Sequence, residues 1–300
     1  MQARFVFWKI CGKIICVGKK GERPMLKKFH FALLGISSLS ILAVLPAMAD
    51  QLTWAHPDNI ESYTVVDGNV NYVLNGGSYN IITGTGMRNT VNGDVNVTLN
   101  GVTQVVSGGE TNVYGILFLP STGSALTLQK LTGETPTAEQ AQMQMYVNGD
   151  VNLNVYNSII GQSVVGVNFY VGSSELTQSG LSGKTTVTVD NSTVEYSVRG
   201  TNYYNSVPDT IPEAKVGDIE INVNDSLIKE EIVSAGSAAS AGNVVINVTG
   251  NTVIGYTELD SDTTKGDGWI IAGANRKGAT IQSTEVNLNT AGLIRIAGDV

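Results

Sequence analysis

Cysteine and histidine are nearly absent from this chain, which has two of each among its 300 residues. Both cysteines, Cys11 and Cys16, lie close to the N-terminus, and of the two histidines only His56 lies beyond residue 49. The rest of the chain therefore has no disulfides and must be held together by its hydrophobic core. The shortage also excludes a Cys/His zinc site and makes a Ser-His-Asp triad improbable. We interpret His56 as a solvated residue of an N-terminal cap.

Positive charge is the second shortage. The chain has 18 Lys and Arg against 26 Asp and Glu, and eight of the basic residues but only one acidic residue lie within residues 1–49. Without that segment, 10 basic and 25 acidic residues remain, a net charge near −15 (10 − 25). Such an acidic chain is a poor partner for nucleic acid or for an anionic lipid surface.

Long hydrophobic runs are also missing, apart from one near the N-terminus. Starting at Met25, two lysines precede an apolar run from Phe31 to Leu45, and Ala47-Met48-Ala49 follows. This order is typical of a signal peptide with cleavage after Ala49, and the run is shorter than the ~20 residues of a membrane-spanning helix. We therefore expect an exported protein with a signal peptide at 25–49 and no membrane span in the mature chain. Residues 1–24 then lie upstream of the true start or form an extended n-region. The alternative is an uncleaved anchor that starts near Phe5.

The chain beyond residue 49 contains a repeat. Seven copies of a short alternating segment begin at Gly68, Gly93, Gly149, Gly183, Gly217, Gly242 and Gln282. Their apolar triplets are Val70/Tyr72/Leu74, Val95/Val97/Leu99, Val151/Leu153/Val155, Thr185/Val187/Val189, Ile219/Ile221/Val223, Val244/Ile246/Val248 and Thr284/Val286/Leu288. Of these 21 positions 19 are apolar, and the positions between them are polar except Val73 and Val245. Alternation with period two predicts strands that bury the triplets and expose the residues between them.

The spacing of the copies predicts how these strands are arranged. Consecutive copies start 25, 56, 34, 34, 25 and 40 residues apart. A unit of 25 residues accommodates three short strands and three turns, which is one coil of a parallel β-helix, and longer intervals are coils with inserted loops. We expect an N-terminal cap at 50–67 and a parallel β-helix at 68–300. The insertions include Thr135–Tyr146, with a short helix over 138–145, and Tyr196–Lys215. The alternative is an antiparallel β-sandwich with tight hairpins at the Asn-Gly pairs.

Three copies resemble the passenger region of Gram-negative autotransporter adhesins: Gly-Asp-Val-Asn-Val-Thr-Leu-Asn-Gly at 93–101, Gly-Asp-Ile-Glu-Ile-Asn-Val-Asn-Asp-Ser at 217–226 and Val-Ile-Asn-Val-Thr-Gly-Asn-Thr-Val at 245–253. The resemblance covers roughly residues 68–300 and lies in pattern and composition. It implies a right-handed β-helix displayed at the cell surface or outer membrane, or released from the cell. It departs from the family in having no C-terminal translocator barrel, which predicts a chain truncated at its C-terminus.

The sequence predicts binding and no catalysis. Asp94, Asp150, Asp218 and Glu220 recur at equivalent repeat positions, which is typical of turn and outer-face residues that keep a protein soluble. We expect a non-enzymatic adhesin without cofactor or metal, which binds a host or microbial surface protein or glycan through its inserted loops. Candidate contact residues are Tyr203, Tyr204, Asp260, Asp262, Asp267 and Trp269. Two alternatives stay open: an inactive truncated passenger, and a secreted β-helix polysaccharide lyase or glycoside hydrolase. The enzyme would need an acidic cluster with a basic partner on one long groove.

Overall fold

The computed structural model forms two compact units, Met1–Met48 and Ala49–Val300. It describes residues 52–87, 89–106, 112–117, 137, 139, 145–168, 179–181, 183–201, 215–236, 240–255, 268–273 and 280–291, and in the first unit 9–10 and 13–14. In the first unit, β1 (Lys9–Ile10) pairs antiparallel with β2 (Lys13–Ile14). The proposed signal peptide at 25–49 lies outside the described residues, as do 292–300.

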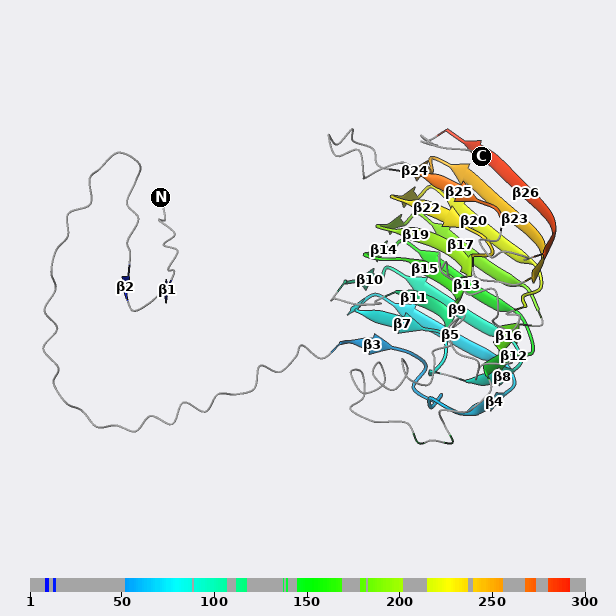
Figure 1. The fold of residues 1–300 in the computed structure, drawn as a ribbon, viewed down its shortest axis with the longest axis horizontal. Helices are drawn as coiled ribbons and strands as arrows, with labels where there is room; N and C mark the ends of the chain where they lie inside the picture. The colour runs from blue at the N-terminus through cyan, green and yellow to red at the C-terminus, as the bar shows by residue number, and fades with distance from the viewer. Residues whose placement is uncertain are drawn as a thin grey trace, which may run out of the picture. The chain divides into compact units, whose positions relative to one another are not determined.

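The second unit is built from four parallel sheets whose strands stack in chain order (Figure 1). Sheet 1 holds the long strands of the repeat: β5 (Val70–Asn75), β9 (Val95–Asn100), β13 (Val151–Tyr156), β17 (Thr185–Asp190), β20 (Ile219–Asn224), β23 (Ser240–Gly250) and β26 (Thr280–Thr290). Sheet 2 follows it in each coil: β6 (Ser78–Tyr79), β10 (Thr103–Gln104), β14 (Ile159–Ile160), β18 (Thr193–Val194), β21 (Leu227–Ile228) and β24 (Val253–Ile254).

Sheets 3 and 4 complete each coil. Sheet 3 consists of β3 (Trp54–Ala55), β7 (Ile81–Thr83), β11 (Val113–Leu117), β15 (Val164–Asn168), β19 (Ser197–Thr201), β22 (Glu231–Val233) and β25 (Trp269–Ile271). Sheet 4 consists of β4 (Val65–Asp67), β8 (Thr90–Asn92), β12 (Met145–Val147) and β16 (Ser179–Leu181). The last three coils have no separate strand there among the described residues: before β20 only an isolated bridge of Lys215 to Ser240 remains, and the 11-residue β23 and β26 extend sheet 1 towards the preceding turn.

Over the described residues, this arrangement confirms an all-β fold with the stacked parallel strands of a β-solenoid. Every strand pair described in the second unit is parallel, so the antiparallel sandwich is wrong for this part of the chain. The expected three strands per coil were one too few, since sheet 4 adds a fourth in the first coils. No helix occurs among the described residues: Met145 starts β12, Glu139 lies in a turn, and most of 138–144 lies outside the description. The insertion expected from Tyr196 begins later, because β19 runs to Thr201.

The repeat register is the register of sheet 1. Val70 pairs with Val95, Val95 with Val151, Val151 with Thr185, and the series continues to Thr284. The triplets of the five middle coils are buried, as the alternation predicts. The triplets of the outermost strands are less covered: Tyr72 and Leu74 are partly buried, and Val286 and Leu288 are exposed. A coil at either end of a stack is covered by a neighbour on one side only.

The turn after each long strand requires a left-handed backbone. The residues there have φ between +45° and +67° and are Gly76, Gly101, Asn157, Asn191, Asp225 and Gly250. Glycine, asparagine and aspartate are the types that adopt this conformation at least cost. This turn is why the sequence places Asn, Asp or Gly after every triplet, and it redirects the chain from sheet 1 into sheet 2.

Candidate functional site

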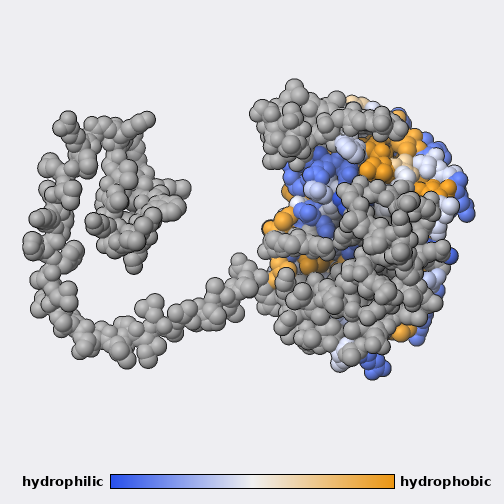
Figure 2. Space-filling model, in the orientation of Figure 1, coloured by the Kyte–Doolittle hydropathy of each residue, from blue (hydrophilic) through white to orange (hydrophobic). Residues whose placement is uncertain are grey.

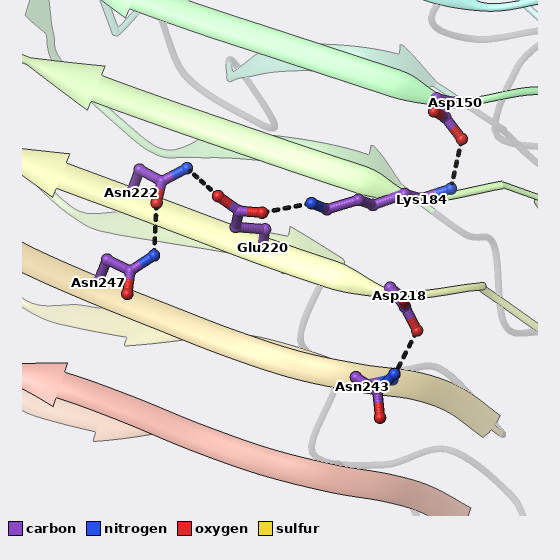
Figure 3. A network of polar contacts seen from close by, with 7 residues as sticks. All are labelled: Asp150, Lys184, Asp218, Glu220, Asn222, Asn243 and Asn247. Atoms are coloured by element: carbon purple, nitrogen blue, oxygen red, sulfur yellow. Dashed lines mark hydrogen bonds and ion pairs between the residues drawn. The ribbon is translucent and has the colours of Figure 1, made fainter.

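The turn that opens the repeat, which is Gly-Asp in three of the seven copies, joins successive coils. The main-chain N–H of Asp94 donates to Oδ1 of Asn69 at 2.9 Å, and that of Asp150 donates to Oδ1 of Asp94 at 2.9 Å. The N–H of Lys184 donates to Oδ1 of Asp150 at 2.7 Å in the same way (Figure 3). These acids are turn residues, as expected, but their carboxylates accept hydrogen bonds between coils. Beyond the solubilising role expected from the sequence, Asp94 and Asp150 therefore also connect neighbouring coils.

The glycine of this turn is required by close contact. A Cβ added to Gly149 would lie 2.4 Å from the main-chain oxygen of Gly93, and one added to Gly183 would lie 2.3 Å from that of Gly149. Because real Cβ atoms do not approach that closely, a larger residue would push the coils apart. The Gly-Asp pair is thus a structural device of the stack.

Removing one of these acceptors gives a direct test of the device. We expect Asp150→Ala to lower the free energy of unfolding by about 1–2 kcal/mol, because the N–H of Lys184 loses its acceptor. Asp150→Asn keeps an oxygen at the same place, so its loss should stay below about 0.5 kcal/mol. Urea denaturation of the two variants measures the difference. Equal losses would mean that the charge of Asp150 matters and the hydrogen bond does not.

The side chain of Glu220, like those of Asp94 and Asp150, takes part in contacts between coils. It forms an ion pair with Lys184 and accepts a hydrogen bond from Nδ2 of Asn222 at 2.8 Å (Figure 3). Oδ1 of Asn222 in turn accepts from Nδ2 of Asn247 at 2.8 Å. The hydrogen bonds from Lys184 and then Asn222 lower the pKa of Glu220, so it is a carboxylate at neutral pH. Its role is to continue a polar ladder on the outer face of sheet 1.

Of the predicted contact residues, the structure describes one. Tyr203, Tyr204, Asp260, Asp262 and Asp267 lie outside the described residues. Trp269 is the first residue of β25, and half of its surface (50%) is exposed. Aromatic residues at the ends of strands commonly pack in a core. Trp269 instead stands on the outer face, because its neighbour Ile270 packs against the core and successive side chains alternate.

A group of polar and aromatic side chains surrounds Trp269 on sheet 3. In the register of this sheet Ser197 pairs with Glu231, and Glu231 pairs with Trp269. One residue earlier, the N–H of Glu230 donates to the carbonyl of Tyr196 at 3.0 Å, and the N–H of Trp269 donates to the carbonyl of Glu230 at 3.2 Å. Three successive coils thus bring these residues together. We call Tyr196, Arg199, Glu230, Glu231 and Trp269 the aromatic–carboxylate patch.

The centre of the patch is an ordered ion pair. Nη2 of Arg199 lies 2.9 Å from Oε1 of Glu231, and the two side chains are only 14% and 18% exposed. Ser197 donates from its hydroxyl to the same carboxylate oxygen at 3.2 Å. The guanidinium carbon of Arg199 lies 5.8 Å from the centre of the Tyr196 ring, within reach of a cation–π contact. These contacts fix the charged groups while the rings of Tyr196 and Trp269, 39% and 50% exposed, face solvent.

The second carboxylate of the patch is that of Glu230. Burial raises the pKa of Glu230, and the neighbouring charge of Glu231 raises it further. Glu230 in turn is the main cause that raises the pKa of Tyr196, since its negative charge opposes a phenolate. An acid with a raised pKa beside a second carboxylate that is held in an ion pair is the kind of arrangement that can divide acid and base roles.

This pKa shift makes stability depend on pH. The folded-state pKa of Glu230 lies above its unfolded value of about 4.3, so the native state binds more protons between the two values. The free energy of unfolding should therefore fall as pH rises through that window. Melting temperatures of Glu230→Gln measured from pH 4 to pH 7 should lack this decline. Parallel curves for the variant and the unchanged protein would contradict the assignment.

Sequence reasoning missed the patch apart from Trp269. The one sequence feature that marks the patch is Glu230-Glu231, the only place after residue 49 where two acidic residues are adjacent. Tyr196 and Arg199 gave no signal, because they come next to the pair only through an interval of 34 residues between coils. On the visible described surface, hydrophobic residues lie in small separate areas among hydrophilic ones (Figure 2).

The N-terminal end of the stack is a weaker candidate site than the aromatic–carboxylate patch. A hollow of about 400 Å³ lies there between Pro57 and Asn71, with a mostly polar lining and no converging group of charges. His56 is half-buried, which corrects its expected solvation: its ring centre lies 3.8 Å from that of Trp54, and burial lowers its pKa.

In the described part of the chain, no three His, Cys, Asp or Glu side chains could hold a metal ion. The described residues also include no helix with the length and hydropathy that crossing a bilayer requires.

Comparison with known proteins adds no relative. No protein-family model, curated protein or solved structure matches the chain. The resemblance to autotransporter passengers therefore rests on the repeat pattern and the parallel strands alone.

Proposed function

We propose that this protein is an exported, adhesin-like binding protein of a Gram-negative bacterium, of the autotransporter-passenger type and without enzymatic activity. Its stacked coils, wound to the right, would serve as a rigid scaffold at the cell surface or outside the cell. The leader at 25–49, the acidic balance and the repeat pattern support this proposal. The partner is a surface protein or glycan of a host or of another microbe.

One observation carries the proposal. The repeat residues that first suggest chemistry, Asp94, Asp150 and Glu220, are occupied in contacts between coils. The aromatic–carboxylate patch, by contrast, presents two exposed rings beside charged groups that are already held in place. A fixed surface with exposed aromatic rings suits binding, because little side-chain freedom is lost when a partner docks.

The test is export followed by adhesion. We expect the full chain, expressed in a Gram-negative host, to be recovered outside the cytoplasm with Asp50 as its first residue. Latex beads coated with this material should be retained on glycan- or protein-coated surfaces, whereas beads coated with the heat-denatured protein should not. Retention of the leader on the exported chain would contradict the export route. Absence of adhesion to every coated surface would overturn the function.

A second function has one observation in its favour. Glu230, with its raised pKa, stands beside Glu231 and its Arg199 partner, which is the acidic cluster with a basic partner that a glycoside hydrolase or lyase would need. If the protein is such an enzyme, Glu230→Gln should abolish the release of reducing ends or unsaturated sugars from polysaccharides. We expect no such release from either protein. Turnover that disappears in Glu230→Gln would replace the adhesin by the enzyme.

A further inference from the structure

We propose that the aromatic–carboxylate patch is a binding site for an uncharged, hydroxyl-rich glycan. This inference rests on the proposed function and specifies its ligand and its place. The two rings belong to different coils: Tyr196 precedes β19, Trp269 starts β25, and β22 lies between these strands. Neighbouring strands are about 4.8 Å apart, so the main chains at the two aromatic residues are separated by about 10 Å. Between them lie Glu230 and Glu231.

The chemistry of these groups fits sugar rings. Tyr and Trp combine an apolar face with a polar tip, and the C–H face of a pyranose packs on such a ring. Carboxylate oxygens accept hydrogen bonds from hydroxyl groups, and Arg199 and Ser197 hold Glu231 at 2.9 Å and 3.2 Å for that task. A site built to bond hydroxyl groups discriminates strongly against ligands that lack them, because its polar groups would be left without partners.

Charge decides which glycans fit. Around the patch, Glu195, Glu230 and Glu231 outnumber Arg199 and Lys229, and both cations are paired: Nζ of Lys229 lies 2.5 Å from Oε2 of Glu195. The chain beyond residue 49 also carries a net charge near −15 (10 − 25). A polysaccharide of uronic acids or sulfated sugars would meet this negative field, and among the described residues of this area both cations already have carboxylate partners. The ligand is therefore neutral.

A glycan also suits the patch better than a protein partner does. A stable protein interface buries about 800 Å² on each side around a hydrophobic centre. The patch instead combines two separated aromatic rings with carboxylates. Sugar rings need only one aromatic face each, together with polar groups at their edges.

The experiment measures binding of the full-length exported protein by surface plasmon resonance. The probes are neutral mannan, galactan and β-glucan, acidic polygalacturonate, and collagen as a protein surface. We expect at least one neutral polysaccharide to bind and polygalacturonate to bind at least tenfold more weakly. Trp269→Ala and Tyr196→Ala should each weaken neutral-glycan binding by about tenfold or more, a loss usual for a central aromatic contact. Trp269→Phe, which keeps an aromatic face, should lose less than Trp269→Ala.

Tyr156→Ala is the matched control, because Tyr156 is a partly exposed aromatic residue on sheet 1, away from the patch. It should bind as the unchanged protein does, and thermal melts should confirm that every variant folds. Neutral-glycan binding that survives in both alanine variants would overturn the proposed site while leaving the adhesin function intact. Binding to collagen or polygalacturonate alone would overturn the ligand class. Failure to bind any probe would count against the glycan ligand, and the bead adhesion described above decides whether the proposed function fails with it.

Discussion

Gly166→Ala is expected to destabilise the protein by about 3 kcal/mol, the upper range for inserting a methyl group into a packed core. A Cβ at this position would lie 2.6 Å from Cγ2 of Thr185, 2.7 Å from the main-chain oxygen of Gly200 and 2.9 Å from Cγ2 of Val187. Two of these neighbours are stiff β-branched side chains, and the third is the backbone of the next coil. None can move without displacing strands of sheets 1 and 3.

Gly166 belongs to a column of glycines that crosses the coils on sheet 3. The same close approach occurs at Gly84, where a Cβ would lie 2.3 Å from the oxygen of Gly115, and at Gly115, where it would lie 2.5 Å from that of Gly166. Gly200 continues the column towards Ser234. A Cβ at each of the four glycines would also meet a side chain of sheet 1, so sheets 1 and 3 pack against each other at this column.

Gly273→Ala supplies the control for Gly166→Ala. Gly273 follows β25, and a Cβ added there would meet no atom within 4 Å. We expect its free energy of unfolding to change by no more than about 0.5 kcal/mol. Chemical denaturation of both variants gives the two values. A Gly166→Ala protein as stable as Gly273→Ala would show that sheets 1 and 3 are not packed as described.

The second large effect is expected for Val97→Asp. Val97 is fully buried in the middle of the β9 triplet, so the new carboxylate would have no water and no partner. Such a substitution should cost about 4 kcal/mol or more, enough to unfold a marginally stable protein. Fluorescence-monitored unfolding and the yield of folded protein report the loss.

Thr98→Asp is the matched control on the same strand. Thr98 lies one residue further along and faces outward between Val73 and Asn154 of the adjoining coils. We expect a change of about 0.5 kcal/mol or less. Comparable destabilisation by both substitutions would reverse the alternation on which the inward face of sheet 1 depends.

Sheet 1 could be predicted from the sequence because its signals are local. The alternation of Val95, Val97 and Leu99 shows which face is buried, and Asn100-Gly101 marks the turn. The register then follows from aligning the copies, since identical segments stack. The pairing of Val95 with Val151 across 56 residues confirms that the insertion between them leaves the coil unchanged.

Hydrogen bonds between coils outside the triplets were not predicted, because their partners are revealed only when the coils are stacked. Ser158, Ser192 and Ser226 look like ordinary loop residues, yet the N–H of Ser158 donates to Oγ of Ser192 at 3.0 Å, and that of Ser192 to Oγ of Ser226 at 3.1 Å. This buried column satisfies polar groups that a solvated loop would leave to water. Its partners are 34 residues apart, so only the stacking brings them together.

The patch around Trp269 stayed hidden for the same reason. Arg199 and Glu231 are separated by 32 residues, and nothing in either segment indicates the other. Sequence reasoning placed binding in the inserted loops and treated the repeats as scaffold. The structure adds a candidate site on the coils themselves. Three short strands of sheet 3, one from each of three successive coils, present outward-facing residues there.

The most direct test of the stacked parallel coils is a pair of engineered cysteines on sheet 1. Asn96 and Asn152 are register partners in neighbouring coils, with Nδ2 of Asn152 2.9 Å from Oδ1 of Asn96. In a background of Cys11→Ser and Cys16→Ser, Asn96→Cys with Asn152→Cys should form a disulfide on mild oxidation, because adjacent strands place the Cα atoms about 4.8 Å apart. Asn96→Cys with Asn154→Cys is offset by two residues, puts them about 8 Å apart, and should stay reduced. Mass spectrometry of the oxidised proteins distinguishes the cases. A disulfide in the offset pair and none in the register pair would contradict the parallel, in-register coils.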